Sequence, residues 1–454
     1  MKRSIWLLLA ILALATGCSK DDGSGSLTVD TSSFNWDSSV REAQLSIKAD
    51  GYWTASSDVN WCAPLKSEGK NDATLAIWVS PNLTGEARSG HLTIETNSQH
   101  RVIDIQQPAF TGDIDSYEYH LPVVFHVMYN DEANDTLNVK QEHLAKVLTE
   151  VNKLYAENQM NIVFELAKYD DDGDELEEPG VSRHEVKFSE YDATLFLSSK
   201  NKDNRQYAGY TQNLKKYINV FLFRFKQDDA GSVTLGISDT NIVPTAYPLD
   251  SLLATDVANE YAYITSPWGV CINNRYIYEW QDEKTVNPRF IVATLAHELG
   301  HYLGLLHTFS SDECNVDDAC DDTNISDYNS YTASIIELIQ QLAIQGKKPT
   351  MKQVALRVDC KLNVDFLAHN IMDYAYTYAD EFTPQQRKRT RHVLKYGPLV
   401  PGPKLIDYNT TGIVTRSGGE NTSLERCTLQ LSPFHQLPTP CPCPPVRMTQ
   451  KMER

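Results

Sequence analysis

One short segment constrains this chain more than any other, because it places three histidines where they can meet. His297 and His301 stand four residues apart, and His307 follows six residues later. On a helix, residues four apart project from the same face, so the first two imidazoles can share one metal ion. Gly304 can adopt the left-handed conformation that ends a helix, which would let the chain turn and bring His307 to the same ion.

Glu298, directly after the first histidine, gives this candidate metal site a chemical role. Zinc with three protein ligands keeps one position open for water, and a neighbouring carboxylate can remove the proton of that water. We therefore interpret Glu298 as the general base of a zinc-dependent hydrolase. The bare His-Glu-x-x-His pattern often arises by chance, whereas all five positions at this spacing would do so in only about one chain in 10⁴ to 10⁵.

The complete pattern resembles the signature of the metzincin metallopeptidases, His-Glu-x-x-His-x-x-Gly-x-x-His followed by a Met-turn. In that family the methionine forms an apolar floor under the zinc ligands, and a tyrosine two residues later contacts the metal or stabilises the oxyanion. Met372 and Tyr374 match these positions about 65 residues after the last histidine. The resemblance implies an α/β (α+β) zincin-like catalytic domain that hydrolyses peptide bonds.

Among metzincins, the chain most resembles the pappalysins over roughly residues 117 to 400. The likeness is carried by four segments: Asn370-Ile371-Met372-Asp373-Tyr374, Phe382-Thr383-Pro384-Gln385-Gln386, His307-Thr308-Phe309 and Asp322-Thr323. The sequence departs from the family in two respects. The cysteine usual after the Met-turn is absent, and Tyr331 to Val358 has the pattern of a helical insertion.

The loop after the third histidine is rich in acidic residues and cysteines. Pappalysins bind Ca²⁺ near this region, and five aspartates offer suitable oxygen ligands: Asp312, Asp317, Asp318, Asp321 and Asp322. An acidic loop without metal explains them equally well. Three cysteines, Cys314, Cys320 and Cys360, allow one disulfide and leave one thiol over, and the sequence does not decide which pair forms.

Residues 27–109 predict a separate β-sandwich, because short strand-like runs alternate with turns. The runs are residues 43–47, 73–79, 91–96 and 101–105. Trp53-Thr54-Ala55-Ser56, Asn60-Trp61-Cys62 and the closing Ile105-Gln106-Gln107 resemble a BACON domain. That resemblance implies an immunoglobulin-like module, which in this family has been proposed to bind carbohydrate or mucin. A spacer without a ligand remains the alternative.

A second domain, predicted to span residues 117–400, has the pattern of an α/β fold. Leu121–Val127 is a nearly continuous apolar run suited to a buried strand, and Val139–Asn158 has helical spacing. Two more strands are expected at Asn161–Phe164 and Tyr217–Leu222. Beyond this domain, residues 401–454 predict an irregular proline-rich tail, which includes Cys441 and Cys443.

The N-terminus predicts export. Residues 1–17 combine a positive start, a short apolar stretch and small residues, and with Cys18 they resemble a bacterial lipoprotein signal in which that cysteine is lipidated. An ordinary signal peptide cut nearby is the alternative. Residues 18–26 then form the lipidated cysteine and a tether. Lys20-Asp21-Asp22 resembles the surface-export signal of Bacteroidetes lipoproteins, so we expect an outer-membrane lipoprotein exposed on the cell surface.

The sequence thus predicts a cell-surface zinc endopeptidase that acts on proteins or peptides. The formal net charge of −19 argues against a general nucleic-acid binder, which needs clustered Lys and Arg. The alternative from another class is a surface lipoprotein that binds glycan or mucin through its N-terminal domain and carries a catalytically idle zinc domain. The Glu at position 298 favours the enzyme, because a structural zinc site does not need it.

Overall fold

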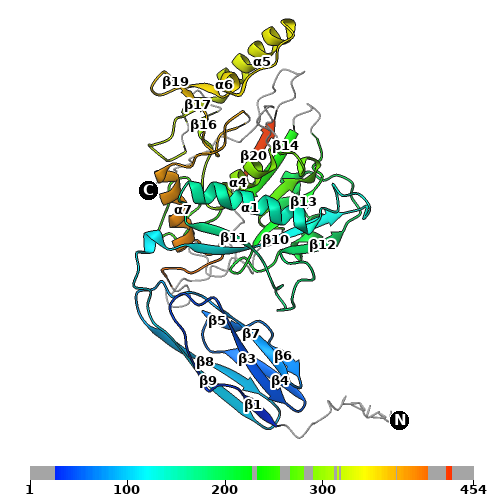
Figure 1. The fold of residues 1–454 in the computed structure, drawn as a ribbon, viewed down its shortest axis with the longest axis vertical. Helices are drawn as coiled ribbons and strands as arrows, with labels where there is room; N and C mark the ends of the chain where they lie inside the picture. Colours follow the sequence, from blue (N-terminus) through cyan, green and yellow to red (C-terminus); the bar gives the residue numbers. More distant parts are fainter. Residues whose placement is uncertain are drawn as a thin grey trace, which may run out of the picture. The chain divides into compact units, whose positions relative to one another are not determined.

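The structure is a computed structural model of the 454-residue chain. It describes residues 26–227, 233–255, 266–280, 290–310, 314–315, 318–374, 376–406 and 426–431. The chain divides into two compact units (Figure 1). Unit 1 is Met1–Val79 with Arg88–Gln107, and unit 2 is Ser80–Ala87 with Pro108–Arg454. The predicted signal peptide, Cys18 and most of the tether lie outside the described residues.

Unit 1 consists of two β-sheets that share one apolar core. The first sheet has the order β1 (Leu27–Val29), β3 (Glu42–Ala49), β7 (Ala73–Val79), β5 (Cys62–Pro64), and the second has the order β2 (Ser33–Asn35), β9 (His100–Gln107), β8 (Arg88–Glu95), β4 (Tyr52–Ser57), β6 (Glu68–Lys70). Every second side chain of β3 and β9 points into the core, including Leu45 and Ile47 from one sheet and Ile103 and Ile105 from the other. The four predicted strands therefore lie where the alternation placed them.

The loop Ser80–Ala87 belongs to unit 2, although the prediction of 27–109 included it in the first domain. Its Leu83 is buried in the main core of unit 2. The Asn82 side chain donates hydrogen bonds to the carbonyls of Glu86 and Pro108, at 2.7 and 3.0 Å. These contacts attach the loop to unit 2.

Unit 2 is built on a seven-stranded mixed sheet. Its strands are β11 (Ile162–Leu166), β10 (Tyr119–Tyr129), β13 (Ile218–Phe223), β15 (Val270–Asn273), β14 (Val233–Asp239) and β20 (Arg426–Leu431) in spatial order, with β12 (Val181–Glu185) also paired to β10. The pairs of β10 with its neighbours and of β13 with β15 are parallel, whereas β14 is antiparallel to both β15 and β20. Strand β20 was not anticipated in the tail that we predicted to be irregular.

Both faces of this sheet are covered, which explains the continuous apolar runs in its strands. All six residues of β13 are buried. On one face, Val220 and Leu222 lie in the core formed with α1 (Gln141–Glu157) and α4 (Ile291–Tyr302). On the other face, Phe221 and Phe223 pack in a second cluster with α2 (Ala193–Leu197). The short helix α3 (Arg205–Ala208) follows α2.

Helix α1 holds α4 against the sheet, and the two are seen side by side in Figure 1. Leu144, Val147, Leu148 and Val151 form the buried stripe of α1, at the spacing that predicted this helix. The fully buried Tyr155 donates a hydrogen bond to the carbonyl of Ala296 on α4 at 3.1 Å. Helix α4, which carries His297 and His301, is thus fixed from both sides.

A small sheet and three helices complete unit 2. The sheet has the order β16 (Phe309–Ser310), β17 (Ser326–Asp327), β18 (Leu356–Asp359), β19 (Val364–Leu367), and the helices are α5 (Tyr328–Ile344), α6 (Met351–Val354) and α7 (Pro384–Tyr396). The predicted helical insertion at Tyr331–Val358 is correct for α5 and α6 and wrong at its end, because Leu356–Val358 lie in strand β18. No described helix is long and apolar enough to cross a membrane.

Candidate metal centre

Helix α4 ends in the glycine turn that the sequence predicted. Gly304 has a φ of +90°, in the left-handed region. The amide of Gly304 donates to the carbonyl of His301 at 2.9 Å, and the amide of Leu305 donates to that of Gly300 at 2.9 Å, which is the Schellman pattern. The buried Arg389 of α7 also donates to the Gly304 carbonyl.

This turn brings the three histidines together. The Nε2 atoms of His297 and His301 are 3.0 Å apart, those of His301 and His307 are 2.9 Å apart, and those of His307 and His297 are 3.2 Å apart. His297 and His301 are buried and His307 is partly buried. Among the described residues, they are the one group of three or more His, Cys, Asp or Glu side chains close enough to hold a metal ion.

The opposite ring nitrogens fix how two of these imidazoles point. His297 Nδ1 donates to the carbonyl of Ile371 at 2.7 Å, and His301 Nδ1 donates to that of Leu305 at 2.8 Å. Burial lowers the pKa of His297 to about 4, and burial together with the nearby His297 lowers the pKa of His301 well below its ordinary value. Both rings are therefore neutral near pH 7, with the proton on Nδ1 and a lone pair on Nε2.

These lone pairs make the site suited to a cation. Two acceptor nitrogens 3.0 Å apart repel each other unless a positive charge lies between them. Nitrogen ligands of one tetrahedral zinc ion, each about 2.0–2.1 Å from it, would be about 3.3 Å apart, close to the spacing observed. Backbone carbonyls that orient the distal nitrogens of histidine ligands are typical of metal sites. The three histidines thus fit zinc.

Met372 packs against helix α4. It is fully buried, and a Cβ added to Gly300 of α4 would lie 2.6 Å from its Sδ. The Met372 carbonyl accepts a hydrogen bond from the amide of Thr308, next to the third histidine, at 3.3 Å. The glycine at position 300 therefore leaves room for the methionine to pack directly against the helix that carries His297 and His301.

The turn around Met372 is shaped by an amide pair. Asn370 Oδ1 accepts from the Met372 amide at 2.9 Å and from Gln386 Nε2 at 3.1 Å, while Asn370 Nδ2 donates to Gln386 Oε1 at 2.9 Å. Gln386 also closes the capping box of α7 with Thr383. These bonds explain why the Asn-x-Met-Asp-Tyr and Phe-Thr-Pro-Gln-Gln segments occur together in the sequence.

Glu298 is fully buried on the side of α4 that lies against β14. A Cβ added to Gly236 of β14 would lie 2.5 Å from Glu298 Cγ and 2.6 Å from Glu298 Oε1. Any larger residue at position 236 would displace the carboxylate. Gly236 and Gly300 could not be recognised as site residues from the sequence, because an isolated glycine in a strand or helix does not show which side chain needs the space.

Tyr374 lies in an aromatic cluster beside the third histidine. Its ring centroid is 4.5 Å from that of His307 and 4.2 Å from that of Phe309, which in turn stacks on His307 at 4.6 Å. Tyr374 is 3% exposed. The structure thus places the Tyr374 ring beside His307, Met372 against Gly300 of α4 and Glu298 against Gly236 of β14, whereas Cys18 lies outside the described residues.

The acidic loop makes structural hydrogen bonds where it is described. Asp318 Oδ1 accepts from the Thr323 hydroxyl at 2.8 Å, and Asp322 Oδ2 accepts from the Gln385 amide at 2.9 Å. The Asp321 amide donates to the Gln385 side chain at 2.8 Å. Asp312 and Asp317 lie outside the described residues. No group of carboxylates in the described part of the chain meets the spacing for a cation, so calcium has no support here.

Comparison with known protein families identifies two domains in the chain. Residues 201–395 match the Peptidase M43 family, described as pregnancy-associated plasma protein-A, and residues 51–107 match the BACON family, described as an N-terminal binding domain. The chain carries a pappalysin-like metallopeptidase domain and a BACON domain. The match to this metallopeptidase family includes all three histidines, Glu298, Met372 and Tyr374. It confirms the resemblance drawn from the sequence.

A curated relative supports the pappalysin-like domain over a limited stretch. An extracellular metalloprotease of Aspergillus oryzae (strain ATCC 42149 / RIB 40) is 36% identical over 100 residues, which are 22% of this chain and 26% of the relative. The matched stretch therefore spans about a quarter of the relative's length. Activity and substrate of the relative as a whole do not transfer through so short a match.

Solved structures similar to this chain give low scores. A GH5 xyloglucanase of Bacteroides ovatus in complex with a XXXG heptasaccharide has 17% identity and a TM-score of 0.19, over 45% of this chain and 57% of that one. A protein from Bacteroides thetaiotaomicron has 13% identity and a TM-score of 0.16, over 20% of this chain and 94% of that one. Likenesses this low carry no argument about the pappalysin-like domain.

Proposed function

We propose that the chain is a zinc-dependent endopeptidase, with His297, His301 and His307 as zinc ligands and Glu298 as general base. The observation that carries this proposal is the convergence of the three Nε2 atoms within 2.9–3.2 Å of one another. Membership of Peptidase M43, whose members are zinc-dependent metallopeptidases, supports the choice of metal. The general-base role of Glu298 is supported by its burial directly beside the first histidine.

Each residue has a distinct task in this proposal. Zinc held here would supply Lewis acidity, which makes water a stronger acid and a peptide carbonyl a better electrophile. Glu298 accepts the proton of the attacking water and delivers it to the leaving amine. The Tyr374 hydroxyl donates a hydrogen bond to the oxyanion. Met372 keeps the ligand-bearing helix and the Tyr374 segment packed together.

The proposed substrate is a protein or peptide outside the cell. Residues 1–26 support export and an outer-membrane lipid anchor at Cys18, with the remainder of the protein displayed on the cell surface. The BACON match at residues 51–107 supports glycan or mucin binding by unit 1. We propose that such binding would hold the enzyme near glycosylated protein substrates.

The test is Glu298→Gln, which keeps the size of the side chain and removes its basicity. We expect the rate of peptide hydrolysis to fall by about 10²–10⁴-fold, which is what a positioned general base contributes. Zinc content, measured by inductively coupled plasma mass spectrometry on the same preparation, should stay at one ion per chain. Retained turnover would remove Glu298 from this role.

A chelator experiment separates the enzyme from the rival, a glycan-binding lipoprotein with an idle zinc domain. Casein or gelatin digestion by the wild-type protein should stop with 1,10-phenanthroline and return when zinc is added back. Glycan or mucin binding without any chelator-sensitive digestion would favour the rival instead.

A further inference from the structure

A buried arginine in the segment predicted as an insertion is bonded to the backbone that carries Tyr374. Arg357 on β18 is 2% exposed. Its Nε donates to Asp373 Oδ2 at 3.0 Å, and its Nη2 donates to the carbonyls of Tyr374 at 2.9 Å and Tyr376 at 3.4 Å. A single guanidinium therefore bonds to three residues, Asp373, Tyr374 and Tyr376.

The guanidinium is in turn held by the helices of the same segment. Its Nη1 donates to the Val354 carbonyl of α6 at 3.2 Å, and its Cζ lies 3.6 Å from the ring centroid of Tyr331 on α5. The Tyr331 hydroxyl donates to the same carbonyl at 2.7 Å. Because the donors of Arg form a rigid planar fork, these contacts fix its position on both sides.

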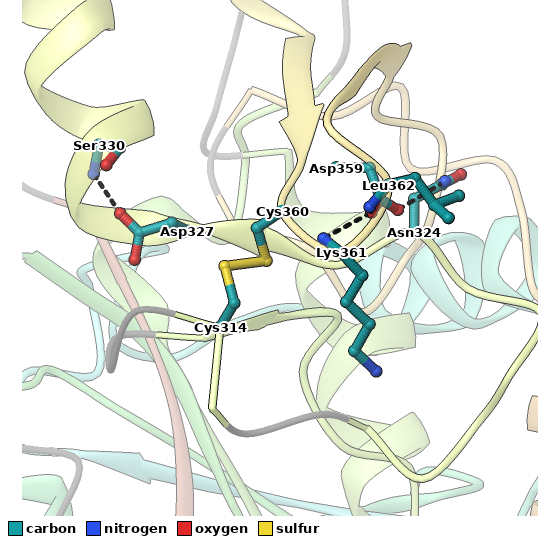
Figure 2. The surroundings of a disulfide bond; sticks show 8 residues. All are labelled: Cys314, Asn324, Asp327, Ser330, Asp359, Cys360, Lys361 and Leu362. Atoms are coloured by element: carbon teal, nitrogen blue, oxygen red, sulfur yellow. Dashed lines mark hydrogen bonds between the residues drawn. A yellow bond between two sulfur atoms is a disulfide. The ribbon is translucent and has the colours of Figure 1, made fainter.

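The base of the segment is also tied to the loop that follows the third histidine (Figure 2). Cys360, at the end of β18, forms a disulfide with Cys314. Asp359 accepts hydrogen bonds from the Asn324 side chain and the Lys361 amide, both at 2.9 Å. The small sheet begins with β16 at Phe309, two residues after His307. The segment thus links Cys314 and Asn324, which follow the third histidine in the chain, to the backbone of Tyr374.

We propose that Arg357 is a positioning residue for Tyr374: it holds the Asp373 side chain and the Tyr374 carbonyl so that the Tyr374 ring stays beside His307. The inference rests on the function proposed above, in which the Tyr374 hydroxyl stabilises the oxyanion. Asp373 neutralises the buried charge, without which a guanidinium would not remain in the interior. Misplacing a catalytic group by about 1 Å can cost about 100-fold in rate.

The test is Arg357→Lys in the full-length, zinc-loaded protein. Lys keeps the charge and cannot bond to the carboxylate and two carbonyls in one fork. We expect kcat for a fluorogenic peptide to fall about 10- to 100-fold, with KM changed by less than about twofold and one zinc per chain retained. Amide hydrogen exchange of residues 368–376 should accelerate. An unchanged kcat in folded, zinc-loaded protein would overturn the proposal.

A double variant distinguishes positioning from general loosening. If Arg357 acts through Tyr374, Arg357→Lys should lower kcat far less in a Tyr374→Phe background than in the wild type. If the fold losses in kcat of the two single variants simply multiply in the double variant, the proposal is contradicted. A wild-type kcat in Tyr374→Phe alone would also contradict it.

Thr350→Ala is the matched control, because it removes the capping box of α6 in the same segment and touches neither Arg357 nor Tyr374. It should lower the melting temperature and leave kcat unchanged. A loss of kcat as large as that of Arg357→Lys would indicate a merely structural effect and overturn the proposal. If the wild type itself hydrolyses no peptide, the proposed function fails, and hydrogen exchange still decides whether Arg357 fixes residues 373–376.

Discussion

The two units bury different kinds of side chain. Among the described residues of unit 1, the buried side chains are almost all apolar, with Gln107 the polar exception. Unit 2 buries imidazoles, carboxylates and guanidinium groups, including His297, Glu298, Arg357 and Asp373. Burying an ionisable group costs free energy unless it has partners, whereas an apolar core forms without such partners. The buried ionisable groups therefore mark the candidate functional site of unit 2.

The largest expected effect is the loss of zinc and activity from unit 2 when one metal ligand is removed. His301→Ala leaves two of the three facing nitrogens, and we expect loss of stoichiometric zinc and of detectable peptide hydrolysis. His392→Ala is the matched control, because His392 is a partly exposed histidine of the same unit, away from the three ligands, and bonds to the Tyr247 carbonyl at 2.9 Å. It should keep both zinc and activity. Peptide hydrolysis by His301→Ala would contradict the role of His301 as a required zinc ligand.

A core substitution in unit 1 should change stability without changing catalysis. Trp53 is 3% exposed, and its Nε1 donates to the Asn71 carbonyl at 2.9 Å. Trp53→Ala should destabilise unit 1 by about 3–5 kcal/mol. Calorimetry should show this as a lower midpoint temperature for the unfolding transition of unit 1. The kcat at a temperature where both units are folded should stay that of the wild type. Thr54→Ala, exposed on the same strand, is the control.

The disulfide should stabilise unit 2 alone. Cys314 and Cys360 are 46 residues apart in sequence, and replacing both with Ser should lower the free energy of unfolding of unit 2 by about 2–4 kcal/mol. The transition of unit 1 should not move. Cys320→Ser changes a buried cysteine outside this disulfide and serves as the control. An unchanged unit 2 transition in the double Ser variant would contradict this role.

A pH-dependent effect concerns a histidine pair away from the metal centre, the buried His126 and the partly buried His184. His126 Nδ1 lies 3.1 Å from His184 Nε2. Burial lowers the pKa of His126 to about 3 and that of His184 to about 4. The unfolded chain, with His pKa values of about 6.5, takes up protons first as the pH falls. The stability of unit 2 should therefore be full above about pH 6.5 and decrease toward about pH 4, by up to about 1.4 kcal/mol per pH unit for each histidine.

His184→Phe checks this slope, because Phe can keep the stacking on Tyr210 and does not titrate. Chemical denaturation of unit 2 between pH 7 and pH 4.5 should give a flatter pH dependence in the variant than in the wild type. Equal slopes would assign the pH dependence to other groups.

The metal centre could be predicted from the sequence to the extent that its geometry is local. The i, i+4 spacing of His297 and His301, and the glycine at 304, specify a helix and a turn within a few residues. The Met372 and Tyr374 positions came from the resemblance to a family. Local patterns also predicted much of the fold. Their periodicity correctly placed β3, β7, β10, α1 and β13.

Long-range pairing could not be predicted in the same way. Arg357 lies in a four-residue alternating stretch after a helical pattern, and nothing near it in sequence identifies Asp373 as its partner. The choice of Cys360 for Cys314 depends on the small sheet that brings β18 beside the His307 loop. The need for glycine at position 236 is likewise explained only by the contact with Glu298 in the folded chain. These features depend on how distant elements meet.

The most direct test of the metal centre is anomalous X-ray scattering at the zinc edge from crystals of the full-length protein. We predict one strong peak about 2.0–2.1 Å from Nε2 of each of His297, His301 and His307. A peak of equal strength should appear in Glu298→Gln. Zinc at another place, or a His307 ring turned away from the other two with no peak between them, would contradict the account.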